Sequence, residues 1–455
     1  MLQNVKKELK ELSPIAIPAV LSQLAQMAMG FIDTVMAGNY NADALAAIAI
    51  GTSLLHPIMV FFLGLFIAFN PIVAHFQGAG KTRNIRTHFH VGIILALLTS
   101  PIAVILLLNS GVVLSALNID AAVAELATGY LDATLWGLPA LFLFFALRFC
   151  NEGMFSTMAV LVITGSSIPF NVLFNYWFIH GGYGVEEMGA VGVGYATALI
   201  WVFMFIGMLL YTLFAKKYAD LRLFKDFELP SRHEVKEIFA LGIPVGITLG
   251  FEITMFAGVS LLIARYPVEV MGAHQIALNI ASVFFMIPLG MSQAITARVS
   301  YFIGKKDLYS MRIAGYTGIS AAILISIFSS TMMVLAPLFL ISIYTSDPVL
   351  TEIAVSLLFF AAIFQFSDAL QVASAGALRG LKDTKMPMII TAISYWVVGI
   401  PAGYYLAEYQ GLEVKGYWIG MVLALTIAAV FLMKRWITLS NQAVKKALMK
   451  EAQPI

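Results

Sequence analysis

Three acidic residues lie inside long apolar stretches of the sequence, where a charge is hard to accommodate. They are Asp33, Glu252 and Asp368. An ionised carboxylate at the centre of a bilayer costs at least about 2.5–3.5 kcal/mol on insertion scales. Such a side chain must face a cavity, a polar partner or a bound cation. These three acids are therefore the first candidates for chemistry.

Asp33 belongs to a polar stripe. Gln23, Gln26, Gly30 and Asp33 follow one another at steps of three, four and three residues. This spacing places all four on one face of a helix. A carboxylate at the end of such a stripe is more simply explained by a functional cavity than by packing alone, so we favour a functional role for Asp33.

Two further predicted helices carry polar oxygens that suit the same chemistry. Asn171 and Asn175 lie one turn apart on one helix, and Thr197 lies on the next. A carboxylate with amide and hydroxyl oxygens suits Na⁺ or a proton relay. The same side chains can also hold helices together through hydrogen bonds. Both interpretations stay open for these three residues.

Glu252 and Asp368 lack an obvious counter-charge in the sequence. No Lys or Arg occupies a comparable depth in the apolar segments around them, whereas Gln365 and Gln371 share a helix face with Asp368. The acids therefore need a proton, an amide partner or a cation. We assign both to cation coupling, with Na⁺ at Glu252 and Asp368 as the metal hypothesis.

Aromatic and amide side chains near the acids are candidates for substrate contacts, because flexible and polarizable surfaces accept varied apolar ligands. The predicted substrate-binding set is Gln26, Asp33, Glu252, Phe256, Gln275, Asn279, Phe284, Phe364 and Asp368.

The composition indicates that lipid surrounds much of the protein. The 455 residues are 60% hydrophobic and 11% charged, whereas a soluble domain carries roughly 25% charged residues. Lipid must therefore cover much of the surface. A net charge of +2 gives no reason to expect nucleic acid, and the single cysteine, Cys150, excludes an internal disulfide. The absence of phosphate-loop, nucleophile-elbow and zinc motifs argues against an enzyme or an ATP-driven pump.

Hydropathy predicts an all-α polytopic membrane protein with twelve spans. The predicted spans are 13–37, 45–76, 88–110, 122–147, 157–180, 190–214, 237–264, 272–303, 312–340, 350–377, 386–407 and 416–434. Basic residues gather at both termini and in the even-numbered loops except the fourth, which has only Arg148 near it. The odd-numbered loops hold only Arg265 and Lys415. This bias predicts a bacterial inner-membrane protein with both termini in the cytoplasm. We expect Arg298 to extend to the cytoplasmic interface.

The second half of the chain repeats the first. Ile17-Pro18 matches Ile243-Pro244 and Gly64 matches Gly290, all at an offset of 226 without gaps. The repeat predicts two six-helix lobes related by a pseudo-two-fold axis along the membrane normal. The predicted N-lobe is 1–214, the cytoplasmic linker is 215–236 and the C-lobe is 237–455.

The acids do not follow this repeat. At the offset of 226, Glu252 aligns with Gln26 and Asp33 with Val259. Later in the repeat the offset is 227, and there Asp368 aligns with Leu141. A symmetric scaffold with asymmetric charge suggests two chemically distinct chambers rather than one ring of carboxylates, as in a channel.

Several segments together resemble the NorM-type branch of the multidrug and toxic compound extrusion (MATE) family. They are Met29–Gly38, Gly250–Thr254, Gly272–Ala277, Asp368–Gln371 and Gly376–Gly380. The resemblance implies a twelve-helix, two-lobe antiporter that exports cationic or polyaromatic compounds against inward Na⁺ or H⁺.

The resemblance also implies residue roles. It assigns Asp33, with Asn171, Asn175 and Thr197, to cation coupling or drug binding in the N-lobe. It assigns Glu252 and Asp368 to the same tasks in the C-lobe. Some relatives have a tyrosine at the position of Phe364, so a hydroxyl ligand is missing here.

The leading hypothesis is a cation-coupled multidrug exporter that needs no cofactor and uses Na⁺, or H⁺, as the coupling ion. The expected partners are cationic drugs and membrane lipids, with no obligatory protein partner and a monomeric state. A flippase for lipid-linked precursors is the alternative, although a phosphate head group usually needs basic side chains that this membrane interior almost lacks. A channel is a second alternative, against which the unmatched acids argue.

Overall fold

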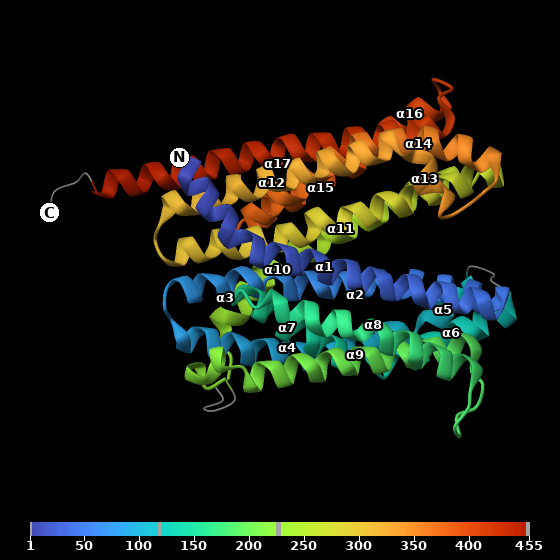
Figure 1. The fold of residues 1–455 in the computed structure, drawn as a ribbon, viewed down its shortest axis with the longest axis horizontal. Helices are drawn as coiled ribbons and strands as arrows, with labels where there is room; N and C mark the ends of the chain where they lie inside the picture. The colour runs from blue at the N-terminus through green and yellow to red at the C-terminus, as the bar shows by residue number, and fades with distance from the viewer. Residues whose placement is uncertain (1, 117–119, 224–228, 452–455) are drawn as a thin grey trace. The chain divides into compact units, whose positions relative to one another are not determined.

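The computed structural model describes residues 2–116, 120–223 and 229–451, and helices make up almost all of them (Figure 1). The first half contains α1 (Leu2–Tyr40), α2 (Ala42–Ile67), α3 (Phe69–Gly78), α4 (Thr82–Leu108), α5 (Ser110–Ala116), α6 (Ala121–Leu135), α7 (Leu138–Gly153), α8 (Thr157–His180), α9 (Gly189–Phe214) and the 3₁₀ helix η1 (Lys216–Leu221). The second half contains α10 (Arg232–Ile263), α11 (Val268–Gly304), α12 (Leu308–Leu335), α13 (Pro337–Ser342), α14 (Pro348–Gly380), α15 (Lys385–Ala392), the π-helical η2 (Ile393–Gly399), α16 (Ile400–Glu408) and α17 (Glu413–Glu451).

The prediction of an all-α protein with twelve spans is confirmed. Among the described residues, eleven helices are long and apolar enough to cross a membrane, and α6 with α7 completes the twelfth span. This pair is bent by 51° within the predicted span 122–147, which contains Pro139. The break falls where Pro139 begins α7, because proline lacks the N–H that would continue the ladder of α6.

Large apolar side chains cover the outer faces of the helices. Leu98 and Ile105 on α4 and Leu324 and Phe328 on α12 are 60–70% exposed. In water such surfaces would aggregate, but in lipid they are the expected outer face. The exposed residues therefore identify the lipid-facing sides of both helices.

The helices form two compact units. The first unit is Leu24–Gly246, and the second unit is Met1–Gln23 together with Ile247–Ile455. The predicted lobes keep every helix whole, whereas these units divide α1 after Gln23 and α10 after Gly246. Each division falls soon after one of the repeated prolines, Pro18 and Pro244. The first part of α10 therefore belongs to the first unit, and the first part of α1 belongs to the second unit.

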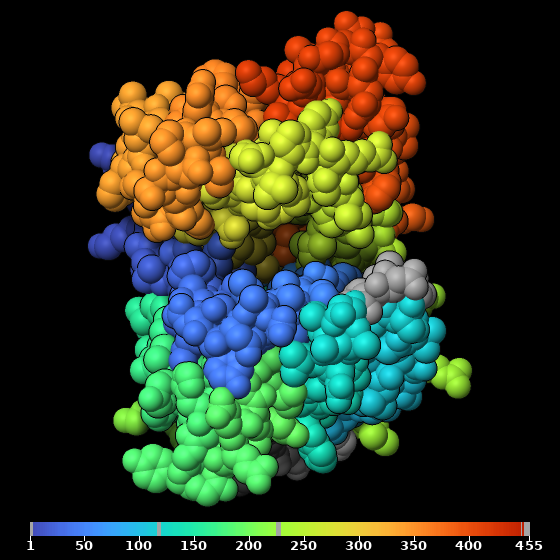
Figure 2. Space-filling model, turned by 90° about the vertical axis from the view of Figure 1, so that its right-hand side faces the viewer, coloured from blue at the N-terminus to red at the C-terminus, as the bar shows by residue number. Residues whose placement is uncertain are grey.

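Within each unit, the connections follow the order expected of antiparallel spans. In the first unit, the ends of α1, α5 and α8 lie on one face, seen in blue, cyan and green in Figure 2. In the second unit, the α10–α11 turn, α13 and α16 likewise lie on one face (Figures 1 and 2). These are the odd-numbered loops, which the sequence predicts to be outside.

A buried ion cluster holds the first part of α1 in the second unit. Arg298 donates to Glu8 Oε1 at 2.7 Å and Oε2 at 2.6 Å, and to Glu11 Oε2 at 2.5 Å. The guanidinium also lies 4.8 Å from the ring centroid of Phe302. Arg298 is therefore held by α1 within the second unit, and its expected position at the cytoplasmic interface stays a prediction. Two carboxylates on α1 neutralise the charge, which allows the side chain to be buried.

Glycines allow equivalent close contacts in both units. A Cβ added at Gly64 would lie 2.2 Å from the Cα of Gly246 in the first unit. A Cβ added at Gly290 would lie 2.5 Å from the Cα of Val20 in the second unit. Both pairs obey the 226-residue offset of the sequence repeat. The repeat therefore extends to the backbone contacts that hold the crossing helices.

We predict that Gly64→Ala destabilises the protein. Overpacking a tight contact typically costs about 1–3 kcal/mol, and here the obstacle is backbone that a rotamer change cannot move. The midpoint of thermal aggregation in detergent should fall by several degrees. Gly165→Ala on α8 is the matched control, because no atom lies within 4 Å of its added Cβ. Equal midpoints for the two variants would contradict the packing argument.

Two candidate ion- and substrate-binding cavities

The first unit encloses a cavity of about 370 Å³ around Asp33. Its walls come from the second part of α1 and from α2, α6, α7, α8 and α9. The helices meet there because small residues let their backbones approach closely. For example, a Cβ at Gly194 would lie 2.5 Å from the carbonyl oxygen of Tyr130.

Asp33 is the centre of a hydrogen-bond cluster. Asn171 Nδ2 and Asn175 Nδ2 donate to its Oδ1 at 2.9 and 2.6 Å. Thr197 Oγ1 donates to its Oδ2 at 3.4 Å. The structure thus brings together all four residues that the sequence grouped, from α1, α8 and α9. Their proposed role in cation coupling stays a prediction.

The two asparagine amides keep acceptor capacity beside the carboxylate. Asn171 Oδ1 and Asn175 Oδ1 are buried and have no hydrogen-bond partner among the described residues. An amide can turn over, so each side chain can present either its nitrogen or its oxygen to Asp33. The cluster can therefore donate to an ionised carboxylate, or join it in surrounding a cation.

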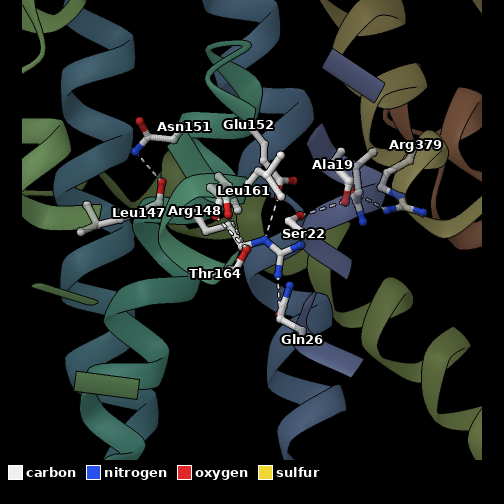
Figure 3. A network of polar contacts seen from close by, with 12 residues as sticks. Ala19, Ser22, Gln26, Leu147, Arg148, Asn151, Glu152, Leu161, Thr164 and Arg379 are labelled. Carbon is white, nitrogen blue, oxygen red and sulfur yellow. Dashed lines mark hydrogen bonds and ion pairs between the residues drawn. The ribbon is translucent and has the colours of Figure 1, made fainter. Parts of the chain in front are cut away.

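A buried charge network borders this cavity at Gln26 (Figure 3). Arg148 Nε donates to Glu152 Oε1 at 2.8 Å, and Arg148 Nη1 donates to Gln26 Oε1 at 2.8 Å. Arg148 and Glu152 are 3% and 1% exposed. Their charges cancel, so the arginine fixes the orientation of Gln26 without neutralising Asp33.

A second set of polar contacts joins Asn151 on α7 to η1. Asn151 Nδ2 donates to the carbonyl of Leu147 at 2.8 Å (Figure 3), and Tyr218 Oη donates to Asn151 Oδ1 at 2.5 Å. Lys217 donates to Ser156 Oγ at 3.1 Å and to the carbonyl of Met154. Burial raises the pKa of the Tyr218 hydroxyl and lowers the pKa of the Lys217 ammonium. These contacts attach the start of the linker to the first unit.

The second unit contains a cavity of about 310 Å³ that is lined by both Glu252 and Asp368. The two acids come from α10 and α14, and α11 supplies a third wall. Asp368 is 2% exposed, and its Oδ1 has no hydrogen-bond partner among the described residues. The structure thus brings together the two acids that the sequence assigned to the C-lobe.

Aromatic rings form the apolar wall of this second cavity. Phe256 and Phe364 both line it, with ring centroids 6.2 Å apart. Phe364 is in turn stacked on Trp418 at 5.7 Å, and Trp418 contacts His274 edge to face at 5.6 Å. This packing fixes the orientation of Phe364 toward the acids. Two carboxylates beside fixed rings suit a flat organic cation.

Two amide side chains, Gln365 and Gln371, lie three residues before and after Asp368 on α14. Both polar atoms of Gln365 are buried and lack a partner among the described residues. Gln371 Nε2 donates to Tyr395 Oη at 2.5 Å, which leaves its Oε1 without a partner there. Amide oxygens of this kind can complete the ligands of a cation held by the two acids.

Three predicted substrate contacts lie outside both cavities. Gln275 and Asn279 are exposed on α11, and Phe284 packs against the hydrophobic core of the second unit. The α11 side chains that line the second cavity are Leu278, Ala281, Ser282, Phe285 and Met286. Phe284 is excluded because neighbouring positions on a helix point about 100° apart. Its neighbour Phe285 occupies the cavity instead.

The sequence did not identify several residues of the first cavity. His56, Tyr130 and Trp201 line it from α2, α6 and α9. They belong to no polar stripe, so single-helix periodicity offered no signal for them. Arg148 and Glu152 lie one turn apart inside α7, which continues to Gly153.

Histidine, cysteine and carboxylate side chains do not gather in threes anywhere in the described part of the chain. A cation bound by Glu252 and Asp368 would therefore also use amide, hydroxyl or water oxygens. The assignment of Na⁺ to these two acids stays a prediction.

Comparisons with known proteins agree with the repeat and the fold. The sequence profile of the MatE family matches residues 18–177 and 244–405. Its two matches begin 226 residues apart, the offset of the internal repeat. The chain is 36% identical to "Multidrug resistance protein NorM" of Aliivibrio fischeri over 448 residues, which is 98% of this chain and 97% of that protein.

Solved structures share the fold. The eukaryotic MATE transporter AtDTX14 matches with a TM-score of 0.85 and 21% identity, over 97% of this chain and 99% of that chain. An outward-facing multidrug resistance MATE family transporter of the MOP superfamily matches with a TM-score of 0.88 and 20% identity, over 96% of this chain and 97% of that chain. The chain therefore belongs to the multidrug and toxic compound extrusion family, in its NorM-type branch, and is a membrane transporter rather than an enzyme.

Proposed function

We propose that this transporter is a secondary active antiporter that exports organic cations and polyaromatic drugs in exchange for Na⁺ or H⁺ by alternating access. The observation that carries the proposal is the second cavity, where Glu252 and Asp368 share one space with Phe256 and Phe364. The name of the NorM relative supports the choice of multidrug substrates.

The two acids make exchange possible because one site serves both ligands. A drug cation and an inward-moving coupling ion each neutralise the carboxylates, so binding of one opposes binding of the other. The aromatic walls favour a flat organic cation by dispersion and cation–π attraction. A small ion instead favours the oxygens of the acids and of Gln365 and Gln371.

The first cavity offers a second place for the coupling ion. Asp33 is surrounded by amides and a hydroxyl, which hold either a small cation or a proton more readily than a large drug. Oxygen ligands near the acids of the second cavity lead us to favour Na⁺, while a proton fits Asp33 well. Either ion can therefore serve as the coupling ion, and an imposed Na⁺ or H⁺ gradient distinguishes them.

The flippase alternative has less support. A phosphate head group calls for unpaired basic side chains in the transport cavity, and Arg148 is instead paired with Glu152. Neither cavity has a lysine or arginine in its lining. Both linings suit a cationic substrate better than an anionic one.

We further propose a bacterial inner membrane as the location, with both termini in the cytoplasm. The basic even-numbered loops support this orientation.

Gradient-driven efflux tests the proposed exchange. Vesicles containing the purified protein should expel ethidium when an inward Na⁺ or H⁺ gradient is imposed. Asp368→Asn should reduce this efflux at least tenfold, because the amide cannot carry the charge that both ligands neutralise. Asp347→Asn is the matched control, since Asp347 caps the exposed start of α14 and asparagine caps equally well. The proposal fails if neither gradient drives efflux, or if Asp368→Asn stays fully coupled.

Drug binding tests the role of Asp33. In the wild type, raising Na⁺ or lowering pH should weaken ethidium binding about tenfold, a coupling free energy of about 1.4 kcal/mol. Asp33→Asn should reduce this ion dependence, whereas Asp43→Asn, on the exposed first turn of α2, should preserve it. An unchanged ion dependence in Asp33→Asn would remove this acid from the coupling scheme.

Cysteine labelling tests the orientation. Cys150 is buried, and a Cys150→Ser background allows single cysteines to be introduced at Arg265 and Lys305. A maleimide that cannot cross membranes should label the cysteine at 265 in cells with a permeabilised outer membrane. It should label the cysteine at 305 only after the inner membrane is opened. The reverse pattern would show that the termini face outward.

A further inference from the structure

We infer that a groove in the second unit, outside both cavities, binds the head group of an anionic phospholipid. The groove has a volume of about 610 Å³ and lies between the first turns of α1, the first half of α12 and Asn441 on α17. It shares no residue with the two cavities. The inference goes beyond the proposed transport function and does not depend on it.

Arg312 supplies a positive charge at one end of the groove. Its Nη1 donates to the neutral amide of Asn441 at 3.2 Å, and its guanidinium lies 5.8 Å from the ring centroid of Tyr309. No carboxylate among the described residues forms an ion pair with it. The contrast is with the buried Arg298, which two carboxylates neutralise. Most of the donors of Arg312 stay available for a phosphate.

Thr317 is the second, independent indication of a polar ligand. The side chain lines the groove and is 6% exposed, and its Oγ1 has no hydrogen-bond partner among the described residues. Other helix threonines here, such as Thr296 and Thr331, donate to the carbonyl four residues earlier. A buried hydroxyl without a partner costs free energy that a ligand oxygen would recover.

The rest of the groove has the character of an acyl chain site. Ile313, Ala321 and Leu324 continue the same face of α12, at helical spacing from Arg312 and Thr317. Arg312 and Leu324 are twelve residues apart, or about 18 Å along a helix. That length is close to one leaflet of a bilayer whose apolar core is about 30 Å thick. A charged end followed by an apolar strip matches a phospholipid lying against the helix.

Location and sign point to an anionic lipid. The charged end of the groove lies near Lys305 and Lys306, at the start of α12 on the proposed cytoplasmic side. Basic pockets between helices on that side attract anionic head groups. The charge of Arg312 opposes binding of a cationic drug. A lipid seated here also contacts Leu9, next to the Glu8 that pairs with Arg298, and so holds the first part of α1 in place.

Lipid titration followed by native mass spectrometry tests this inference. The purified full chain in detergent is titrated with phosphatidylglycerol or phosphatidylcholine, and the constant for the first bound lipid is measured. Phosphatidylglycerol should bind more tightly than phosphatidylcholine. Arg312→Gln should weaken it about tenfold, and Thr317→Val should weaken it several-fold with little loss of thermal stability. Arg265→Gln removes an exposed arginine outside the groove and should change nothing.

Two outcomes would overturn the inference. One is equal phosphatidylglycerol binding by the wild type, Arg312→Gln and Thr317→Val. The other is displacement of the lipid by millimolar inorganic phosphate, which would indicate a site for free phosphate rather than for a lipid. If Arg312→Gln lowers thermal stability, Thr317→Val alone decides between the outcomes, because valine keeps the shape of threonine and removes only the hydroxyl.

Discussion

Close contact between helix backbones underlies both units of this protein. In lipid, apolar side chains gain little by leaving their surroundings, so helices associate mainly through van der Waals contact and a few hydrogen bonds. Gly64 against Gly246 and Gly290 against Val20 are such contacts, and no side chain would fit between the backbones there. They retain the first part of α10 in the first unit and the first part of α1 in the second.

The buried charges fall into two groups. Some are paired in neutral clusters between helices, and the acids of the two cavities have no basic partner in the part of the chain that the structure describes. Arg148 with Glu152 and Arg298 with Glu8 and Glu11 are neutral clusters that position helices. Asp33 has only amide and hydroxyl donors, and the acids of the second cavity share one space without a basic residue in its lining. A buried pair is costly to form and costly to break, so it suits a fixed contact. An acid without a counter-charge suits an exchangeable cation.

The duplicated scaffold carries two different cavities. The first has one acid within a set of amides, and the second has two acids against aromatic rings. Duplication preserved the packing glycines at an offset of 226 but not the acids. Packing contacts constrain both copies equally, since either unit fails without them. Chemistry at a cavity wall is free to differ, because a change such as Leu141 to an acid affects one cavity alone.

The sequence by itself determined the twelve spans, the repeat and the identity of the unpaired acids. Hydropathy and the cost of burying a charge can be assessed for one segment at a time, and the offset of the repeat comes from comparing two segments of the sequence. For this reason Asp33, Glu252 and Asp368 could be found without a structure. Only the tertiary structure decided that Phe285 rather than Phe284 enters the second cavity, because that depends on how α11 is rotated against α14. It also decided which charges are paired. Arg298 and Glu8 are 290 residues apart, and Arg148 and Gln26 are 122 apart. Contacts at such separations follow from helix packing, which no pattern within a single helix encodes.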